Sequence, residues 1–289
     1  MGSLLVSLCN LPSPSDTALL TVDYTLNCCA WVSLGQDGEL LGCTGLTSDE
    51  SRHYVLYLSD GAWHVAVLEK HDLTVVFRQR LMEVDDGHSI LAHQGYLYVV
   101  STGTEEVLRY QIAADRLFGP LVVWRAKTSG TETHHVNSIT AWNGRLVVSA
   151  FGPKSGELWS SATDGYIQDI ASGVRIQRGI HHPHSLASWK GCLCFCESHT
   201  ASVYSTTGRM VELNGYARGM CWLADDLVCV GTSIGRDLGV PGGSPGNPAD
   251  HGEPSGSCGI TLLNPTTGRI LRFIDLGRFG PEIYDLLPC

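Results

Sequence analysis

The sequence lacks any apolar run long enough to cross a membrane, and it is poor in basic residues. No stretch approaches the roughly 20 consecutive apolar residues that a membrane-spanning helix requires. The 19 Lys and Arg residues are outnumbered by 29 Asp and Glu residues, so the formal net charge is −10 at pH 7 with histidine neutral. Binding to a phosphate backbone depends on clustered positive charge. We therefore expect neither a membrane nor a nucleic acid as partner.

The chain also lacks the features of a disordered or an exported protein. Hydrophobic residues make up 43% and charged residues only 17%, which is enough apolar material for a folded core. The first residues, MGSLLVSLCNLPSPSD, contain no basic segment, and Ser and Pro interrupt their short apolar run. The 11 cysteines are odd in number, and Cys192, Cys194, Cys196 and Cys229 lie in apolar runs, which favours reduced, buried thiols over disulfides. We expect a soluble, cytoplasmic protein.

Helical periodicity is almost missing, and short β-type segments take its place. Runs such as YLYVVS at 96–101 and RLVVSA at 145–150 are rich in β-branched and aromatic residues and are bounded by turn dipeptides. The 33 glycines supply the positive φ angles that tight hairpins need. Many short strands with regular turns are typical of an all-β sandwich, barrel or propeller.

A repeat of 47–49 residues distinguishes among these folds. HSILA at 88–92, NSITA at 137–141 and HSLAS at 184–188 each precede a hairpin and a further strand. Weaker copies follow the same pattern: RGMCW at 218–222, NCCAWVSLGQDGELL at 27–41 and EIYDL at 282–286. This period suits one four-stranded propeller blade. Six candidate inner strands therefore predict an all-β, six-bladed β-propeller with four-stranded blades.

We expect residues 1–289 to form a single propeller domain. The segment 235–256, which contains GVPGGSPGNPADHGEPSG, has a Gly and Pro content that fits only a loop inserted between the fifth and sixth inner strands. At the mouth of the channel this loop could act as a lid or bind a partner. On the opposite face it would be an inert insertion.

Several motifs in order along the chain resemble a known family. They are PHS at 183–185, WKG at 189–191, GYARGM at 215–220, VGTS at 230–233, CGI at 258–260, TG at 267–268 and EIYD at 282–285. Together they resemble a bacterial propeller family catalogued as a domain of unknown function, over roughly residues 85–289. The resemblance implies a β-propeller and supplies no established reaction. The chemistry must therefore be inferred from the residues.

The inner strands of a propeller line its central channel, and alternate side chains face the axis at two heights. The aligned strand starts place one ring of five side chains at the axis: His88, Asn137, His184, Arg218 and Tyr284. A second ring lies two residues earlier: Asp86, His135, His182, Tyr216 and Glu282. Four histidines and two carboxylates from different blades thus converge on one axis.

This convergence has a metal-binding and a purely structural interpretation. Neutral imidazoles and carboxylates suit transition metals, and a set of two His and one carboxylate, or of three His, leaves coordination positions open. We predict one transition metal ion, with Fe(II) or Cu favoured and Zn or Mn possible. The predicted ligands are His88, His135, His182, His184 and Asp86. In the structural interpretation the same side chains hydrogen-bond to water or to one another in a wet channel.

The assignment within the rings depends on the alignment alone, because the chain contains no HExxH or CxxC motif. Two of the histidines belong to doublets, so a one-residue shift would replace them by His134 and His181. Glu282 could complete the ligand shell or hold a histidine N–H from behind.

Three further axial residues, with Glu282, form the predicted catalytic set. Arg218 could bind a substrate carboxylate or phosphate with its forked guanidinium, or it could form an ion pair with Asp86 or Glu282. Tyr216 and Tyr284 could donate a proton or position the substrate, or each could satisfy a hydrogen bond within the channel.

These residues indicate a metal-dependent enzyme that acts on a small molecule or peptide with an anionic group. A histidine-rich shell favours Fe(II) or Cu over Ca²⁺, which prefers oxygen ligands, so we predict a redox or oxygen-dependent tailoring reaction. The alternatives are a metal-assisted lyase, hydrolase or isomerase, and a non-catalytic propeller that binds a ligand or a protein. No GxSxG elbow accompanies Ser89, Ser138 or Ser185, which follow the axial positions, so a serine hydrolase is not expected. The sequence contains no phosphate loop or dinucleotide fingerprint.

Overall fold

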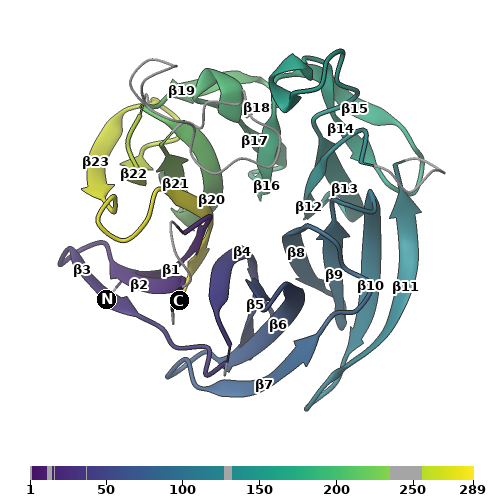
Figure 1. The fold of residues 1–289 in the computed structure, drawn as a ribbon. Coiled ribbons are helices and arrows are strands. Elements are labelled where there is room, and N and C mark those ends of the chain that lie inside the picture. Colours follow the sequence, from purple (N-terminus) through teal and green to yellow (C-terminus); the bar gives the residue numbers. More distant parts are fainter. Residues whose placement is uncertain (1, 12–14, 16, 37, 127–131, 235–255) are drawn as a thin grey trace.

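Six β-sheets surround a central axis in the computed structural model (Figure 1), which describes residues 2–11, 15, 17–36, 38–126, 132–234 and 256–289. Each sheet has four antiparallel strands. The predicted six-bladed β-propeller with four-stranded blades is confirmed. No helix in these ranges is long and apolar enough to cross a membrane. Most of the predicted loop, residues 235–255, lies outside the described residues.

The blades are numbered here in chain order from the first inner strand. Blade 1 contains β4 (Leu40–Ser48), β5 (Arg52–Ser59), β6 (Ala62–Glu69) and β7 (Val75–Arg80), and blade 2 contains β8 (Gly87–His93), β9 (Tyr96–Ser101), β10 (Glu106–Ile112) and β11 (Leu117–Arg125). Blade 3 contains β12 (Val136–Trp142), β13 (Arg145–Ala150), β14 (Gly165–Asp169) and β15 (Arg175–Ile180), and blade 4 contains β16 (Pro183–Trp189), β17 (Cys192–Glu197), β18 (Ser202–Ser205) and β19 (Gly208–Glu212). Blade 5 contains β20 (Tyr216–Ala224), β21 (Leu227–Ser233), β22 (Gly259–Leu263) and β23 (Ile270–Asp275), and blade 6 contains β24 (Glu282–Pro288), β1 (Ser3–Cys9), β2 (Leu19–Asp23) and β3 (Cys28–Trp31).

Blade 6 closes the ring because it combines both ends of the chain. Its inner strand is β24, which pairs antiparallel with β1. The prediction of an inner strand within residues 27–41 is therefore wrong. The strand found there, β3, is the outermost strand of blade 6, and the inner strand of blade 1 begins only at Leu40. The other five predicted inner strands correspond to β8, β12, β16, β20 and β24.

Apolar side chains fill the space between neighbouring blades. One cluster, for example, joins Tyr54 and Leu56 of β5 to Ile90 of β8 and to Leu97 and Val99 of β9. The blades therefore pack face to face, and their polar strand starts are left to line the axis. All eleven cysteines are free, as the sequence predicts.

A buried hydroxyl group links each blade to the inner strand of the next. Six such hydrogen bonds, one at each blade interface, run from side chain to backbone carbonyl: Ser7 to Thr44 (2.6 Å), Thr44 to Gly87 (2.9 Å), Thr102 to Val136 (2.6 Å), Ser149 to Pro183 (3.3 Å), Ser198 to Ala217 (2.6 Å) and Ser233 to Ile283 (3.0 Å). Each contributes about 0.5–1.5 kcal/mol. Their acceptors lie beside the axial residues, so these bonds fix the part of each inner strand that carries the polar rings.

The inner strands are also irregular beside these hydrogen bonds, near the axial residues. Pairing with the second strand shifts between Gly87 and Ile90 in β8, between Val136 and Ser138 in β12, and between His184 and Ala187 in β16. Such bulges bend a strand and re-aim its side chains. The two-residue alternation assumed for the axial rings therefore does not continue through this region.

Candidate metal centre

Asp86, His88 and His135 form a group that could hold a metal ion. One ligand atom from each residue lies within 4.8 Å of the others, and all three side chains are partly buried. Asp86 directly precedes β8 and His88 is its second residue, whereas His135 directly precedes β12. The centre therefore lies where the inner strands of blades 2 and 3 begin, at the position that the aligned repeats predict.

The backbone just before the inner strands is left-handed at three non-glycine residues in equivalent positions. Asp86 has a φ of 48°, His135 of 51° and His182 of 55°. This conformation costs roughly 1–2 kcal/mol per residue and occurs preferentially at functional sites. The carbonyls of these residues accept equivalent N–H bonds, such as the one from Thr102 to Asp86 at 3.0 Å. The strained turn is therefore built into three successive blades.

The hydrogen bond of His88 leaves one ring nitrogen available for a metal. Nδ1 of His88 lies 3.0 Å from the carbonyl oxygen of Asp86. Because a carbonyl oxygen only accepts, Nδ1 must carry the hydrogen, and Nε2 retains its lone pair. Such a backbone bond is the usual way in which a metal-binding histidine is oriented.

His135 is oriented by a carboxylate that the sequence analysis did not identify. Its Nδ1 forms a short hydrogen bond with Glu132, which gives the carboxylate–histidine arrangement found behind many metal ions. The rings of Phe151 and Trp159 pack on His135 at centroid distances of 4.3 and 4.8 Å. Burial lowers the pKa of His135 well below 6.5, so its imidazole is neutral at pH 7, as a ligand must be.

Glu132 adds negative charge beside the centre. Burial, followed by the nearby Asp86 carboxylate, raises the pKa of Glu132 to about 7. A cation beside Glu132 favours its ionised form, so a metal ion at the centre would be stabilised by this carboxylate. The repeat alignment did not identify Glu132 because it lies three residues before His135, outside the two aligned ring positions. The one signal for it in the sequence is its spacing of three residues from His135.

His182 does not join the metal-binding group, although it occupies the predicted ring position. Its Nε2 donates to the carbonyl oxygen of Trp159 at 2.9 Å, and its Nδ1 lies 3.2 Å from the hydroxyl of Tyr216. Both ring nitrogens are thus engaged. The ring of Phe151 stacks on His182 at 4.3 Å and stands between His182 and His135. The prediction of His182 as a ligand is not supported by this geometry.

His184 is also outside the group. Its Nδ1 lies 3.0 Å from the carbonyl oxygen of His182 and 2.7 Å from the Ser198 hydroxyl, and it lines a different pocket. The other histidine of each doublet, which a one-residue shift in the alignment would have selected, is not in the group either. His134 contacts the Tyr166 hydroxyl at 3.3 Å, and His181 lies beside His199. Of the five predicted ligands the structure brings three together.

A pocket of about 200 Å³ opens beside the metal-binding group. Its lining includes Asp86, His88, His135, Arg218, Tyr284 and Cys9. The group is therefore open to the pocket on one side, and a ligand bound there would contact both the metal position and the axial Arg218 and Tyr284.

Arg218 and Glu282 form a buried ion pair in this region, as one interpretation of the sequence anticipated. Nη1 of Arg218 lies 3.0 Å from Oε2 of Glu282, and the two side chains are 11% and 7% exposed. Burial opposes the charge of Arg218, but the carboxylate of Glu282 raises its pKa above the ordinary value. Nε of Arg218 has no hydrogen-bond partner among the described residues, so the guanidinium retains a donor.

The two predicted catalytic tyrosines are placed differently. Tyr284 lines the pocket, and its buried hydroxyl has no hydrogen-bond partner in the described part of the chain. Burial raises the pKa of Tyr284, which keeps the phenol protonated and able to donate. Tyr216 contacts His182 and packs under the Arg218 guanidinium at 4.8 Å. It therefore supports His182 from the next blade and Arg218 from the same strand, β20.

The fold and these axial residues define a six-bladed β-propeller with a candidate metal centre where its inner strands begin. The chain belongs to the family described as a domain of unknown function (DUF4915), whose model matches residues 45–288. The resemblance seen in the sequence motifs is thereby confirmed. No curated protein matches the chain in sequence.

Solved structures support the fold alone, because their identities to this chain are low. A protein of unknown function from Bacteroides caccae has a TM-score of 0.65 at 9% identity and covers 99% of this chain and 98% of its own. A chain of a nidogen/laminin complex has a TM-score of 0.62 at 8% identity, with coverages of 100% and 98%. A luciferin-regenerating enzyme has a TM-score of 0.58 at 10% identity, with coverages of 84% and 78%.

Proposed function

We propose that the protein is a metal-dependent enzyme whose single transition metal ion is held by Asp86, His88 and His135. The observation that carries this proposal is the convergence of one carboxylate and two histidines from two blades within 4.8 Å. Because Nδ1 of both histidines is engaged in a hydrogen bond, Nε2 of each ring is the nitrogen that can bind the metal. Three protein ligands on one side of an ion leave the remaining positions open for substrate.

The donor set favours Fe(II). Two histidines and one carboxylate with open positions are typical of non-haem Fe(II) oxygenases, whereas Zn or Mn would suit hydrolysis, elimination or isomerisation. Cu is a further candidate because it accepts imidazole ligands. We therefore propose a redox or oxygen-dependent tailoring reaction, with a metal-assisted lyase, hydrolase or isomerase as the second candidate.

The pocket beside the centre suggests the kind of substrate. Its volume of about 200 Å³ accepts a small molecule or one side chain of a peptide. Arg218 would bind an anionic group of this substrate through donors that Glu282 does not use. Tyr284, protonated and without a partner in the described chain, would donate a hydrogen bond to the reacting group. The net charge of −10 supports a small-molecule or peptide substrate over a nucleic acid.

The likeness to other propellers leaves two classes of function to be separated. One similar structure is named as a luciferin-regenerating enzyme, and another comes from a nidogen/laminin complex. A non-catalytic propeller would need no metal ion at its axis. Metal content therefore separates an enzyme of the proposed type from a binding platform.

The test is metal analysis by inductively coupled plasma mass spectrometry after reconstitution with Fe(II), Mn(II) or Zn(II). We expect about one equivalent in the natural protein. Removal of an outer hydrogen-bond partner of a metal-binding histidine costs about 10–100-fold in metal affinity. His88→Ala and His135→Ala each remove a ligand, so each should lower the metal affinity by more than this. His182→Ala is the matched control, because its nitrogens are engaged elsewhere, and it should retain the metal.

Two outcomes would overturn the proposal. Either the natural protein takes up no metal, or the ligand variants retain as much metal as the control. Circular dichroism of every variant must show the β-rich fold, so that loss of metal reflects the centre and not unfolding.

A further inference from the structure

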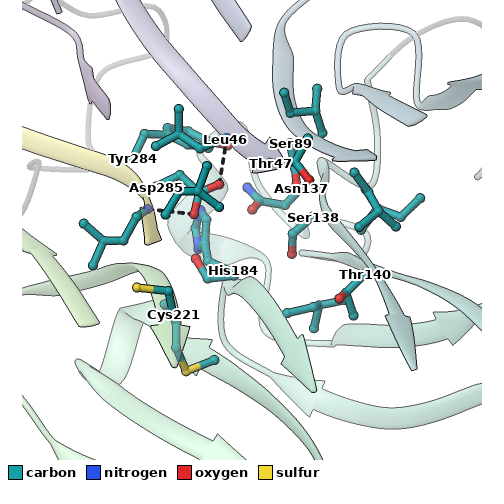
Figure 2. Close-up of a pocket in the computed structure, with 18 residues that line it drawn as sticks. Leu46, Thr47, Ser89, Asn137, Ser138, Thr140, His184, Cys221, Tyr284 and Asp285 are labelled. Atoms are coloured by element: carbon teal, nitrogen blue, oxygen red, sulfur yellow. Dashed lines mark hydrogen bonds between the residues drawn. The ribbon is translucent and has the colours of Figure 1, made fainter. Parts of the chain in front are cut away.

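The channel contains a second pocket, of about 180 Å³, further along the axis (Figure 2). Asn137 of β12, His184 of β16, and Tyr284 and Asp285 of β24 contribute polar groups to it. Tyr284 lines both pockets, so the second one adjoins the metal-binding pocket without containing its ligands. Much of the remaining wall is apolar, with Leu186 and Met220 among its members.

Three buried polar atoms in this wall have no hydrogen-bond partner among the described residues: Nδ2 of Asn137, Nε2 of His184 and the hydroxyl of Tyr284. Asn137 is 1% exposed and His184 is 2% exposed. Buried polar groups are almost always hydrogen-bonded in native proteins, and three around one cavity point to an occupant that satisfies them.

The chemistry of each atom limits what can bind. Nδ1 of His184 donates to the carbonyl of His182, so Nε2 is an acceptor and needs a donor on the ligand. Nδ2 of Asn137 is a donor and needs an acceptor on the ligand. The hydroxyl of Tyr284 can do either. A suitable ligand must therefore carry both a donor and an acceptor.

Asp285 determines the charge of the ligand. Its carboxylate accepts the N–H groups of Leu46 at 3.0 Å and of Leu286 at 2.9 Å (Figure 2). No Lys or Arg lines this pocket, and no ion pair within the described ranges includes Asp285. Burial raises the pKa of Asp285 to about 7, as expected for a carboxylate without a cationic partner. A cation in the pocket would supply that partner, whereas an anion would be repelled.

We propose that the second pocket binds a small organic ammonium ion that also carries an oxygen acceptor, as an amino alcohol does. The ammonium group donates to Asp285 and to Nε2 of His184, and the amide of Asn137 donates to the ligand oxygen. Asp285, His184 and Cys221 all line this pocket, but they are not among the sets of three converging ligand atoms in the described residues, and a transition metal site takes at least three protein ligands. This site goes beyond the proposed function and does not require the metal ion.

Three probes of similar size test the proposal by isothermal titration calorimetry on the full-length protein: ethanolamine, ethylene glycol and glycolate, which are cationic, neutral and anionic. The buffer must be free of amines. We expect ethanolamine to bind, and both other probes to bind about 10-fold more weakly or not at all, because hydrogen bonds between charged partners are the stronger ones. Asp285→Asn should weaken ethanolamine binding by a similar factor.

Two further variants keep the test decisive. Asn137→Ala serves as a second variant in case Asp285→Asn fails to fold. It removes an amide nitrogen that has no partner in the described chain, so it should weaken ethanolamine binding without destabilising the fold. His88→Ala removes a ligand of the metal-binding pocket and should leave ethanolamine binding unchanged. The proposal is overturned if ethylene glycol binds as tightly as ethanolamine, if none of the probes binds, or if binding is lost in His88→Ala and kept in both other variants.

Discussion

The hydrogen bond between Glu132 and His135 allows a demanding test of how the metal centre is organised. Replacing Glu132 by Gln preserves the size of the side chain and an oxygen that can accept from Nδ1, but it removes the negative charge. An ionised carboxylate behind a histidine raises the basicity of the nitrogen that binds the metal. The variant should therefore retain one metal ion per chain and bind it less tightly.

The expected loss follows from the position of Glu132 as an outer partner and not a ligand. Outer hydrogen-bond partners of metal-binding histidines are worth about 10–100-fold in metal affinity, which corresponds to roughly 1.4–2.7 kcal/mol. The upper end applies here because the Glu132 side chain is only 30% exposed and solvent screens it weakly. Removal of a ligand, as in His135→Ala, should cost more than this.

The assay is competition for Zn(II) or Co(II) between the protein and a chelator of known affinity, together with the absorption spectrum of the Co(II) form. Glu197→Gln is the control: Glu197 accepts the N–H of His181 in blade 4 at 2.9 Å, away from the centre. An affinity for Glu132→Gln equal to that of the natural protein would refute the reasoning. So would an equal loss in Glu197→Gln, which would indicate a general loss of charge.

Further predictions concern stability. His182 has its pKa lowered to about 4 and His184 has its pKa lowered well below 6.5, in both cases first by burial, so the folded protein binds fewer protons than the unfolded chain below pH 6.5. Each of these histidines therefore lowers the free energy of unfolding below pH 6.5, by about 1.4 kcal/mol per pH unit down to pH 4. Glu132 and Asp285, with pKa values raised to about 7, act in the opposite direction, so the histidine effect is measured against a variant. In urea unfolding the natural protein should lose about 2 kcal/mol more than His182→Ala between pH 7 and pH 5, and an equal change in both would contradict this. Glu282→Gln leaves buried Arg218 without its carboxylate and should lower the free energy of unfolding by about 3–5 kcal/mol, whereas adding Arg218→Met should restore part of the loss; a double variant less stable than the single one would contradict the account. Thr102→Val removes one of the hydroxyl links between blades and should lower the free energy of unfolding by about 1–3 kcal/mol in the same assay, and no change would show that these links do not stabilise the ring.

The architecture could be predicted from the sequence because each blade repeats the same local pattern. The starts of β8, β12 and β16 recur at nearly constant spacing, because each is the inner strand of its blade and begins a hairpin at the axis. The closure of the ring could not be predicted in the same way. Pairing of β1 with β24 joins residues nearly a chain length apart, and a local pattern carries no information on such a contact.

The candidate site was predicted in part for the same reason. Equivalent strand starts converge on the axis, which identifies Asp86, His88 and His135. Alternation along a strand does not reveal that Phe151, which follows β13, enters between His135 and His182. Nor does it reveal Glu132, whose role depends on the path of the chain before β12.

The metal centre is tested most directly by anomalous X-ray diffraction from metal-loaded crystals, recorded on both sides of the absorption edge of the metal. We expect one strong anomalous peak about 2.0–2.2 Å from a carboxylate oxygen of Asp86 and from one imidazole nitrogen each of His88 and His135. A peak at another place, such as the neighbouring His181 and His199, would contradict it. So would the absence of any peak at the axis in crystals that contain stoichiometric metal.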